Sequence, residues 1–199
     1  HQEEGLAVIR QICTESDEQD MIRFLQKIRN HHAINMHGPE HHAMVPGIIL
    51  ATYKSLGGKI SKEDILTGIS RGSKVPGGAC GFWGSCGAAL GAGIAFSVIF
   101  GATPLTPKKR QQAQSICARI LTKVSAQAGA RCCQRDAVVA LKEAAKLSRD
   151  LLPVSLKADD LLPCRQYLLN RECIRKQCPL WESRDKTISA QTAQLPMAS

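Results

Sequence analysis

The strongest restriction on the fold comes from residues 75–107, a stretch that carries no formally charged side chain. Its helical part, about residues 86–101, reads CGAALGAGIAFSVIFG. A membrane-spanning helix needs about 20 consecutive apolar residues, and this segment is shorter and interrupted by glycines. Gly87 and Gly91 form a small-xxx-small pair, which lets another helix approach closely. We therefore expect the buried central helix of a bundle and no membrane span.

Helical signals continue on both sides of this segment, and no alternating strand pattern of any length occurs. Caps, glycines and prolines set the predicted limits. These are a capping box at Ser16-Asp17-Glu18-Gln19, an apolar helix over 44–56 closed by Gly57-Gly58, a helix capped by Ser61, a long basic helix from Thr106-Pro107 to Gly129, a helix over 133–150 and a short helix near 165–169. The fold class is all-α, a compact bundle around the Gly/Ala-rich central helix.

The domain prediction is a single helical, cysteine-rich domain over residues 1–185. Within it, residues 163–180 form a short C-terminal cysteine knuckle, and residues 186–199 form a disordered tail.

The chain has nine cysteines, an odd number at irregular spacing, with Cys132 and Cys133 adjacent. This is a poor disulfide framework, and clustered cysteines in a reducing compartment are typical of metal ligands or redox groups. Residues 1–30 are charged throughout and lack the apolar core of a signal peptide. We therefore expect a cytoplasmic protein.

The formal net charge of +9 is concentrated in residues 108–149. A basic region can attract nucleic acid or an acidic protein partner. Aromatic residues are only 4% of the chain and are not interleaved with these cations, so nucleic acid is not favoured. A solvated helix face is the simpler explanation.

The first candidate site is the glycine-rich segment that contains Cys80 and Cys86. Gly81 and Gly87 let the backbone fold tightly around an inorganic group, and the following helix start stabilises anionic sulfur. The alternative is a tight turn with two buried free cysteines.

The second candidate is Arg131-Cys132-Cys133-Gln134-Arg135. Adjacent cysteines rarely ligate one ion together because their side chains diverge, so we expect Cys132 to bind a metal and Cys133 to exchange sulfur or electrons. Arg131 and Arg135 would offset the charge of a thiolate or cluster and donate hydrogen bonds to sulfur.

The third candidate comprises Cys164, Cys173 and Cys178-Pro179. A cysteine followed by proline is typical of ferredoxin-like ligation. A structural zinc held by these three cysteines and one further ligand is an alternative. The spacing matches neither the common zinc-finger pattern nor the standard ferredoxin pattern.

The fourth candidate is the loop His37-Gly38-Pro39-Glu40-His41-His42. Histidine and glutamate together can complete a metal site or act as general acid and base. We assign His37 and Glu40 to acid–base chemistry and His41 to a metal. A helix that starts near Glu40 would direct either His41 or His42 into a cleft.

These segments together resemble an uncharacterised prokaryotic family, found chiefly in anaerobes and sometimes fused to methyltransferase-like domains. The matching motifs are HGPEHH (37–42), VPGG-x-CGFWGSCGAALGAGI (75–94), GATPL (101–105), RCC-x-RD (131–136) and EC-x4-CP (172–179). The central motif is also similar to the C-GCAxxG-C-C putative redox proteins. The resemblance implies cysteine-based redox or cluster binding through His37, Glu40, His41, His42, Cys80, Cys86, Cys132, Cys133, Cys173 and Cys178.

The leading functional hypothesis is an iron–sulfur protein, with a [4Fe-4S] cluster, that acts in redox or sulfur transfer. One alternative is a zinc-stabilised interaction domain that docks a methyltransferase-like or redox partner. The other is a cluster-dependent enzyme that uses His37 and Glu40. All three depend on the segments around residues 80–86 and 131–133 meeting in space.

Overall fold

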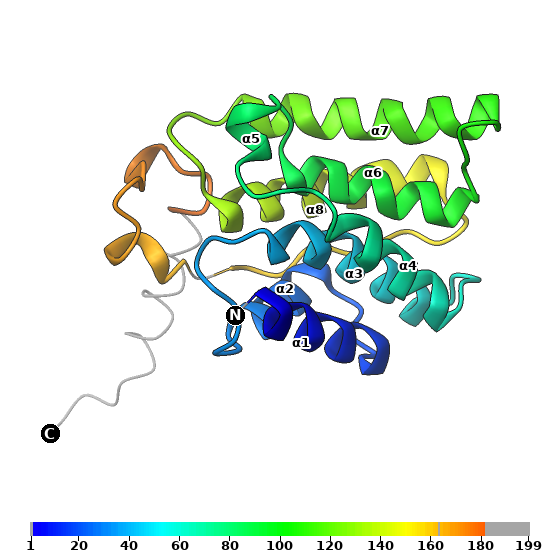
Figure 1. Ribbon diagram of the computed structural model, residues 1–199, viewed down its shortest axis with the longest axis horizontal. Helices are drawn as coiled ribbons and strands as arrows, with labels where there is room; N and C mark the ends of the chain where they lie inside the picture. The colour runs from blue at the N-terminus through cyan, green and yellow to red at the C-terminus, as the bar shows by residue number, and fades with distance from the viewer. Residues whose placement is uncertain (1, 163, 182–199) are drawn as a thin grey trace, which may run out of the picture.

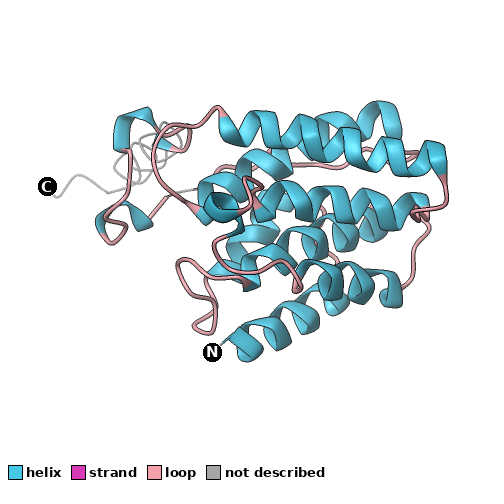
Figure 2. Ribbon diagram, turned by 45° about the horizontal axis from the view of Figure 1, so that its top comes forward, coloured by secondary structure: helices cyan, strands magenta, loops and turns pink. Residues whose placement is uncertain are grey.

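The computed structural model describes residues 2–162 and 164–181, and within these ranges the chain is helical and forms no strand (Figure 2). The all-α prediction is confirmed. The helices are α1 (Gln2–Glu15), α2 (Met21–Arg29), α3 (Glu40–Ser55), α4 (Lys62–Gly72), α5 (Ala79–Phe82), α6 (Gly87–Phe100), α7 (Pro107–Ser125) and α8 (Cys133–Leu151), followed by the short 3-10 helices η1 (Gln166–Leu168) and η2 (Arg175–Gln177). The tail expected at residues 186–199 lies outside the described residues.

Two helices, α3 and α6, form the centre of the bundle (Figure 1). Helix α3 packs against α1, α4 and α6, while α6 also packs against α7 and α8. Both helices are apolar on most sides because they have neighbours on most sides. None of the helices in the described part of the chain is long and apolar enough to cross a membrane.

The glycines of α6 allow the close contact with α3 that their spacing predicts. A Cβ atom at Gly91 would lie 2.8 Å from Cδ of Pro46, and a Cβ at Gly87 would collide with the ring of His42. Both partners belong to α3, so the prediction of a close helix approach is confirmed. Helix α6 ends at Gly101, whose φ of 59° is left-handed and favours glycine.

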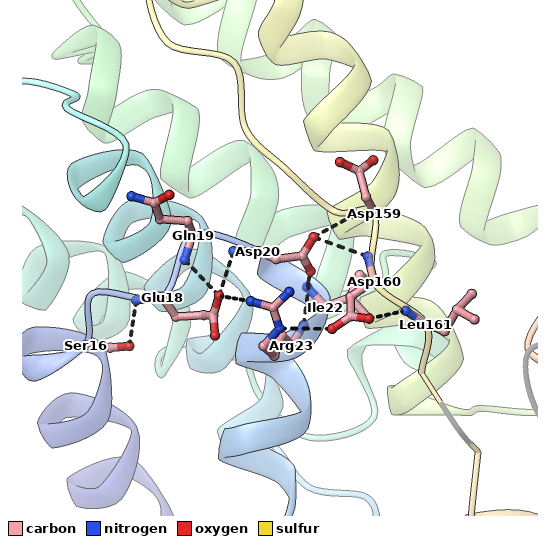
Figure 3. Close-up of polar contacts among 9 residues, drawn as sticks. All are labelled: Ser16, Glu18, Gln19, Asp20, Ile22, Arg23, Asp159, Asp160 and Leu161. Atoms are coloured by element: carbon pink, nitrogen blue, oxygen red, sulfur yellow. Dashed lines mark hydrogen bonds and ion pairs between the residues drawn. The ribbon is translucent and has the colours of Figure 1, made fainter. Parts of the chain in front are cut away.

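The start of α2 differs from the prediction. The capping box expected at Ser16-Asp17-Glu18-Gln19 is wrong, and Asp20 is the N-cap instead. Its Oδ1 accepts hydrogen bonds from the amides of Ile22 (2.9 Å) and Arg23 (3.1 Å). Its Oδ2 accepts from the amides of Asp159 (2.7 Å) and Asp160 (3.2 Å), so one carboxylate also fixes the segment after α8 (Figure 3).

Two other helix limits test the predicted caps. Ser61 caps α4, as expected, and it forms a reciprocal capping box with Asp64. Helix α7 begins at Pro107 as predicted but ends at Ser125, earlier than Gly129. Gly129 instead lies in the connection to α8 with a φ of 84°.

One end of the bundle gathers segments that are distant in sequence. Helix α5, the connection from α7 to α8 and the C-terminal segment all lie at this end (Figure 1). The first residues of α3, α6 and α8 line one cavity there.

Candidate functional site

The cavity has a volume of about 200 Å³ and is formed by the starts of three helices. Pro39 is the N-cap of α3, Cys86 is the N-cap of α6, and Cys133 is the first residue of α8. Helix starts carry partial positive charge. The cavity therefore combines thiols with a positive backbone environment.

Three thiols, from Cys80, Cys86 and Cys133, line this cavity. The segments around residues 80–86 and 131–133 therefore meet, as the functional hypotheses require. None of the nine cysteines, all of which are described, forms a disulfide.

Burial sets the ionisation of two of these thiols. It raises the pKa of Cys86 to about 11, and the charge of Asp136 acts in the same direction. The amides of Ala88 and Ala89 face this sulfur and favour the thiolate, although neither meets hydrogen-bond geometry. Burial also raises the pKa of Cys133, against the opposing effects of the Gly38 amide and the Arg29 charge. Both side chains are thus neutral thiols near pH 7 until a guest displaces their protons.

His41 is buried and has both ring nitrogens engaged. Its Nδ1 accepts a 2.7 Å hydrogen bond from Arg29 Nη1, and its Nε2 donates a 2.9 Å hydrogen bond to the Asn35 carbonyl. Burial and the Arg29 charge lower the pKa of His41 to about 3. The ring is therefore neutral, with no lone pair left for the metal that the sequence assigned to it.

His42 is the histidine of this pair that remains available. Its Nδ1 lies 2.9 Å from the Val75 carbonyl oxygen, and its ring lines the cavity. Within the described residues its Nε2 makes no hydrogen bond. The family resemblance included His42, but the residue pattern alone could not separate it from the adjacent His41.

His37 lines the cavity, whereas Glu40 does not. The ring nitrogens of His37 are buried and have no hydrogen-bond partner within the described residues. Burial lowers the pKa of His37, while the nearby Asn170 favours its charged form. Glu40 is buried, and its Oε1 accepts from the amide and side chain of Asn35 at 3.3 and 3.2 Å, which holds the loop before α3.

The adjacent cysteines Cys132 and Cys133 lie in different surroundings. Cys133 lines the cavity, whereas Cys132 lies within electrostatic reach of Cys164 and Cys178. Burial raises the pKa of both Cys132 and Cys178. The Cys173 sulfur accepts a 3.4 Å hydrogen bond from the Arg175 amide. The predicted cysteine ligands are thus divided between the cavity and a second thiol group, Cys132, Cys164 and Cys178, while Cys173 belongs to neither.

The two predicted arginines occupy different environments. Arg131 is exposed and lines both the cavity and a neighbouring hollow of about 310 Å³. Arg135 is buried, pairs with Asp136 at 2.8 Å, and donates to the carbonyls of Ala128 (2.9 Å) and Ala130 (3.2 Å). Arg135 therefore holds the connection from α7 to α8, and its bonded partners are oxygens.

The predicted glycines also differ. Gly87 supports the ring of His42, while a Cβ at Gly81 would meet nothing within 4 Å. Asp136 lines the cavity beside the thiols and was not among the predicted site residues. Its only signal is its place at the end of the RCC-x-RD motif. Within residues 2–162 and 164–181, no three His, Cys, Asp or Glu side chains form a group that could hold a single metal ion.

Fold and site together define a class of protein, an all-α bundle with a thiol-lined cavity where three helices begin. The chain belongs to a family of unknown function, DUF5714, whose model matches residues 9–181. No curated protein and no solved structure matches it.

Proposed function

We propose that the protein binds an iron–sulfur cluster through Cys80, Cys86 and Cys133 and acts in redox or sulfur transfer. The observation that carries this proposal is the meeting of three thiols, from separate segments, around one cavity. Thiolates are soft ligands and are the standard ligands of iron–sulfur clusters.

The surroundings of the thiols fit an anionic, polynuclear guest. The starts of α3, α6 and α8 favour negative charge. Each thiolate of a cluster binds a different iron, so the sulfurs need not surround one point. A single zinc ion, in contrast, needs four donors at about 2.0–2.3 Å from one centre.

Proton release is part of the proposed binding. Because burial holds Cys86 and Cys133 in the thiol form, their protons must leave when iron binds. The bound cluster would supply electron transfer. The chain would hold it and surround it with helix starts, with the exposed Cys80 on its solvent side.

The direct test is elemental analysis of protein purified without oxygen from iron-replete cells. We expect iron and acid-labile sulfide in comparable amounts and a broad visible absorption. A colourless, iron-free preparation would refute the proposal.

A zinc-stabilised interaction domain is the second candidate, and it would use the separate thiol group of Cys132, Cys164 and Cys178. These sulfurs would have to move closer together to hold one ion, since no three such side chains among the described residues form a single-ion site. Zinc there would tie the C-terminal segment to the start of α8, where a redox or methyltransferase-like partner could dock. Stoichiometric zinc, with unfolding of the domain by a chelator, would support this candidate.

A cluster-dependent enzyme is favoured by His37, whose ring lines the cavity and has no hydrogen-bond partner in the part of the chain that the structure describes. Glu40, its expected partner, is bound to Asn35 instead. Loss of activity with an intact cluster in His37→Ala would support this role.

A further inference from the structure

We infer that His42 is the fourth protein ligand of the centre held by Cys80, Cys86 and Cys133. The inference rests on the proposed function and adds to it a specific nitrogen ligand. It follows from how the ring is held, from what it faces, and from the state of the neighbouring polar groups.

The hydrogen bond to Val75 fixes the tautomer of His42. A carbonyl oxygen can only accept, so Nδ1, at 2.9 Å from it, must carry the proton. The neutral ring then has its lone pair on Nε2. Histidines that bind metals typically donate their other ring nitrogen to a carbonyl or carboxylate in this way.

The position of the ring is fixed by Gly87 as well as by Val75. A Cβ atom at Gly87 would overlap Cδ2 of His42 and lie 2.5 Å from its Nε2. Only glycine therefore lets the ring lie against the start of α6. Because Gly87 directly follows Cys86, the ring is placed beside one of the proposed sulfur ligands.

The other polar groups at this end are less suited to the role. His41 has both nitrogens occupied, and the carboxylate of Glu40 lies outside the cavity lining. His37 lines the cavity, but within the described residues no hydrogen bond orients its ring. His37 is therefore the competing ligand in the experiment.

The experiment is pulsed EPR of the anaerobically reconstituted and reduced protein, which detects ¹⁴N bound to a paramagnetic cluster. Wild type, His42→Ala, His37→Ala and His41→Gln are compared at equal iron content. We expect a strong ¹⁴N coupling that disappears in His42→Ala and persists in the other two variants. Persistence in His42→Ala, or its loss in His37→Ala alone, would overturn the inference.

A second variant guards against a folding failure of His42→Ala. His42→Cys keeps a ligand, so the cluster should remain while the ¹⁴N coupling disappears. Its reduction potential should fall, because imidazole ligands raise the potential relative to thiolates. An unchanged potential and coupling would contradict a ligand role.

The metal-free protein offers an independent measurement. Nitrogen-15 NMR of the histidine side chains should show His42 with its proton on Nδ1, and Gly87→Ala should disturb that signal. A proton on Nε2 would overturn the inference. If the wild-type cluster shows no ¹⁴N coupling, His42 is not a ligand but the proposed function stands. If the wild-type protein forms no cluster, both the ligand role of His42 and the proposed function are refuted.

Discussion

The start of α2 differs from the starts of α3, α6 and α8, which line the cavity, in how the exposed backbone amides are capped. A helix start exposes amide groups that need hydrogen-bond acceptors. Helix α2 supplies Asp20, whose carboxylate accepts four backbone amides. Among the described residues no side chain caps α3, α6 or α8, whose N-cap residues are Pro39, Cys86 and Cys132.

Two aspartates show the consequence of this difference. Burial raises the pKa of Asp20, but the four amides outweigh it and lower the pKa overall. Burial likewise raises the pKa of Asp136 near the cavity, and there the pairing with Arg135 does not reverse it. One helix start is thus completed by the chain itself. The N-cap residues of α3, α6 and α8 are poor caps, and two of them, Cys86 and Cys132, are cysteines. These helix starts therefore give up local stability at the end of the bundle where a guest would bind.

The largest expected effect is on iron content. Cys86→Ser and Cys133→Ser should each lower the iron bound per protein by about tenfold or more, since even residues outside the ligand set contribute about 10–100-fold to metal affinity. Iron and sulfide assays after anaerobic reconstitution measure this effect. Cys117→Ala is the matched control, because Cys117 packs against Gly93 between α6 and α7. If all three variants bound the same amount of iron, the thiols at the starts of α6 and α8 would not be ligands, and these helix starts would not differ from that of α2 in binding a guest.

The next effect is on folding at the start of α2. Asp20→Asn should lower the free energy of unfolding by about 2 kcal/mol, because it weakens one helix cap and the charge-assisted bonds to Asp159 and Asp160. Chemical denaturation of the metal-free protein measures the loss. Iron content should stay at the wild-type value. Asp17→Asn is the surface control, because Asp17 is exposed, and an effect of similar size there would show that Asp20 has no special role.

The same variant has a predictable pH dependence. The folded pKa of Asp20 lies below its ordinary value, so its ionisation stabilises the fold above the unfolded pKa of about 4. That contribution is lost as pH falls through the folded pKa. The difference in unfolding free energy between wild type and Asp20→Asn should therefore be full at pH 7 and shrink below about pH 4. A constant difference down to pH 3 would show that the carboxylate charge is not involved.

The sequence predicted the helices that carry their own local signals. Ser61 and Asp64 make a capping box with each other, so four residues of sequence sufficed. Asp20 caps α2 in place of the box expected at Ser16, because its carboxylate also accepts hydrogen bonds from the amides of Asp159 and Asp160. No local sequence pattern shows these distant amides. Local rules fail where a long-range contact decides between two plausible caps.

The candidate site shows the same limit. The glycines beside Cys80 and Cys86 indicated a loop that could bind an inorganic group, and the adjacent Cys132 and Cys133 indicated a second segment of the site. Both His41 and His42 line the cavity, and neighbouring residues on a helix point about 100° apart, so sequence could not tell which of the two keeps a free ring nitrogen. Arg29 on one side and Val75 on the other make that choice.

The smallest effect gives the sharpest test, because one substitution should move two properties in opposite directions. Serine is a good N-cap and cysteine is not, so Cys86→Ser should raise the unfolding free energy of the metal-free protein by about 0.5–1 kcal/mol while iron binding falls. Denaturation of the metal-free Cys86→Ser and Cys117→Ser proteins separates the cap from a general effect of a hydroxyl, since residue 117 lies inside α7. A less stable Cys86→Ser protein would mean that the amides at the start of α6 are already satisfied. The cavity would then have no unmet backbone donors to offer an anionic guest.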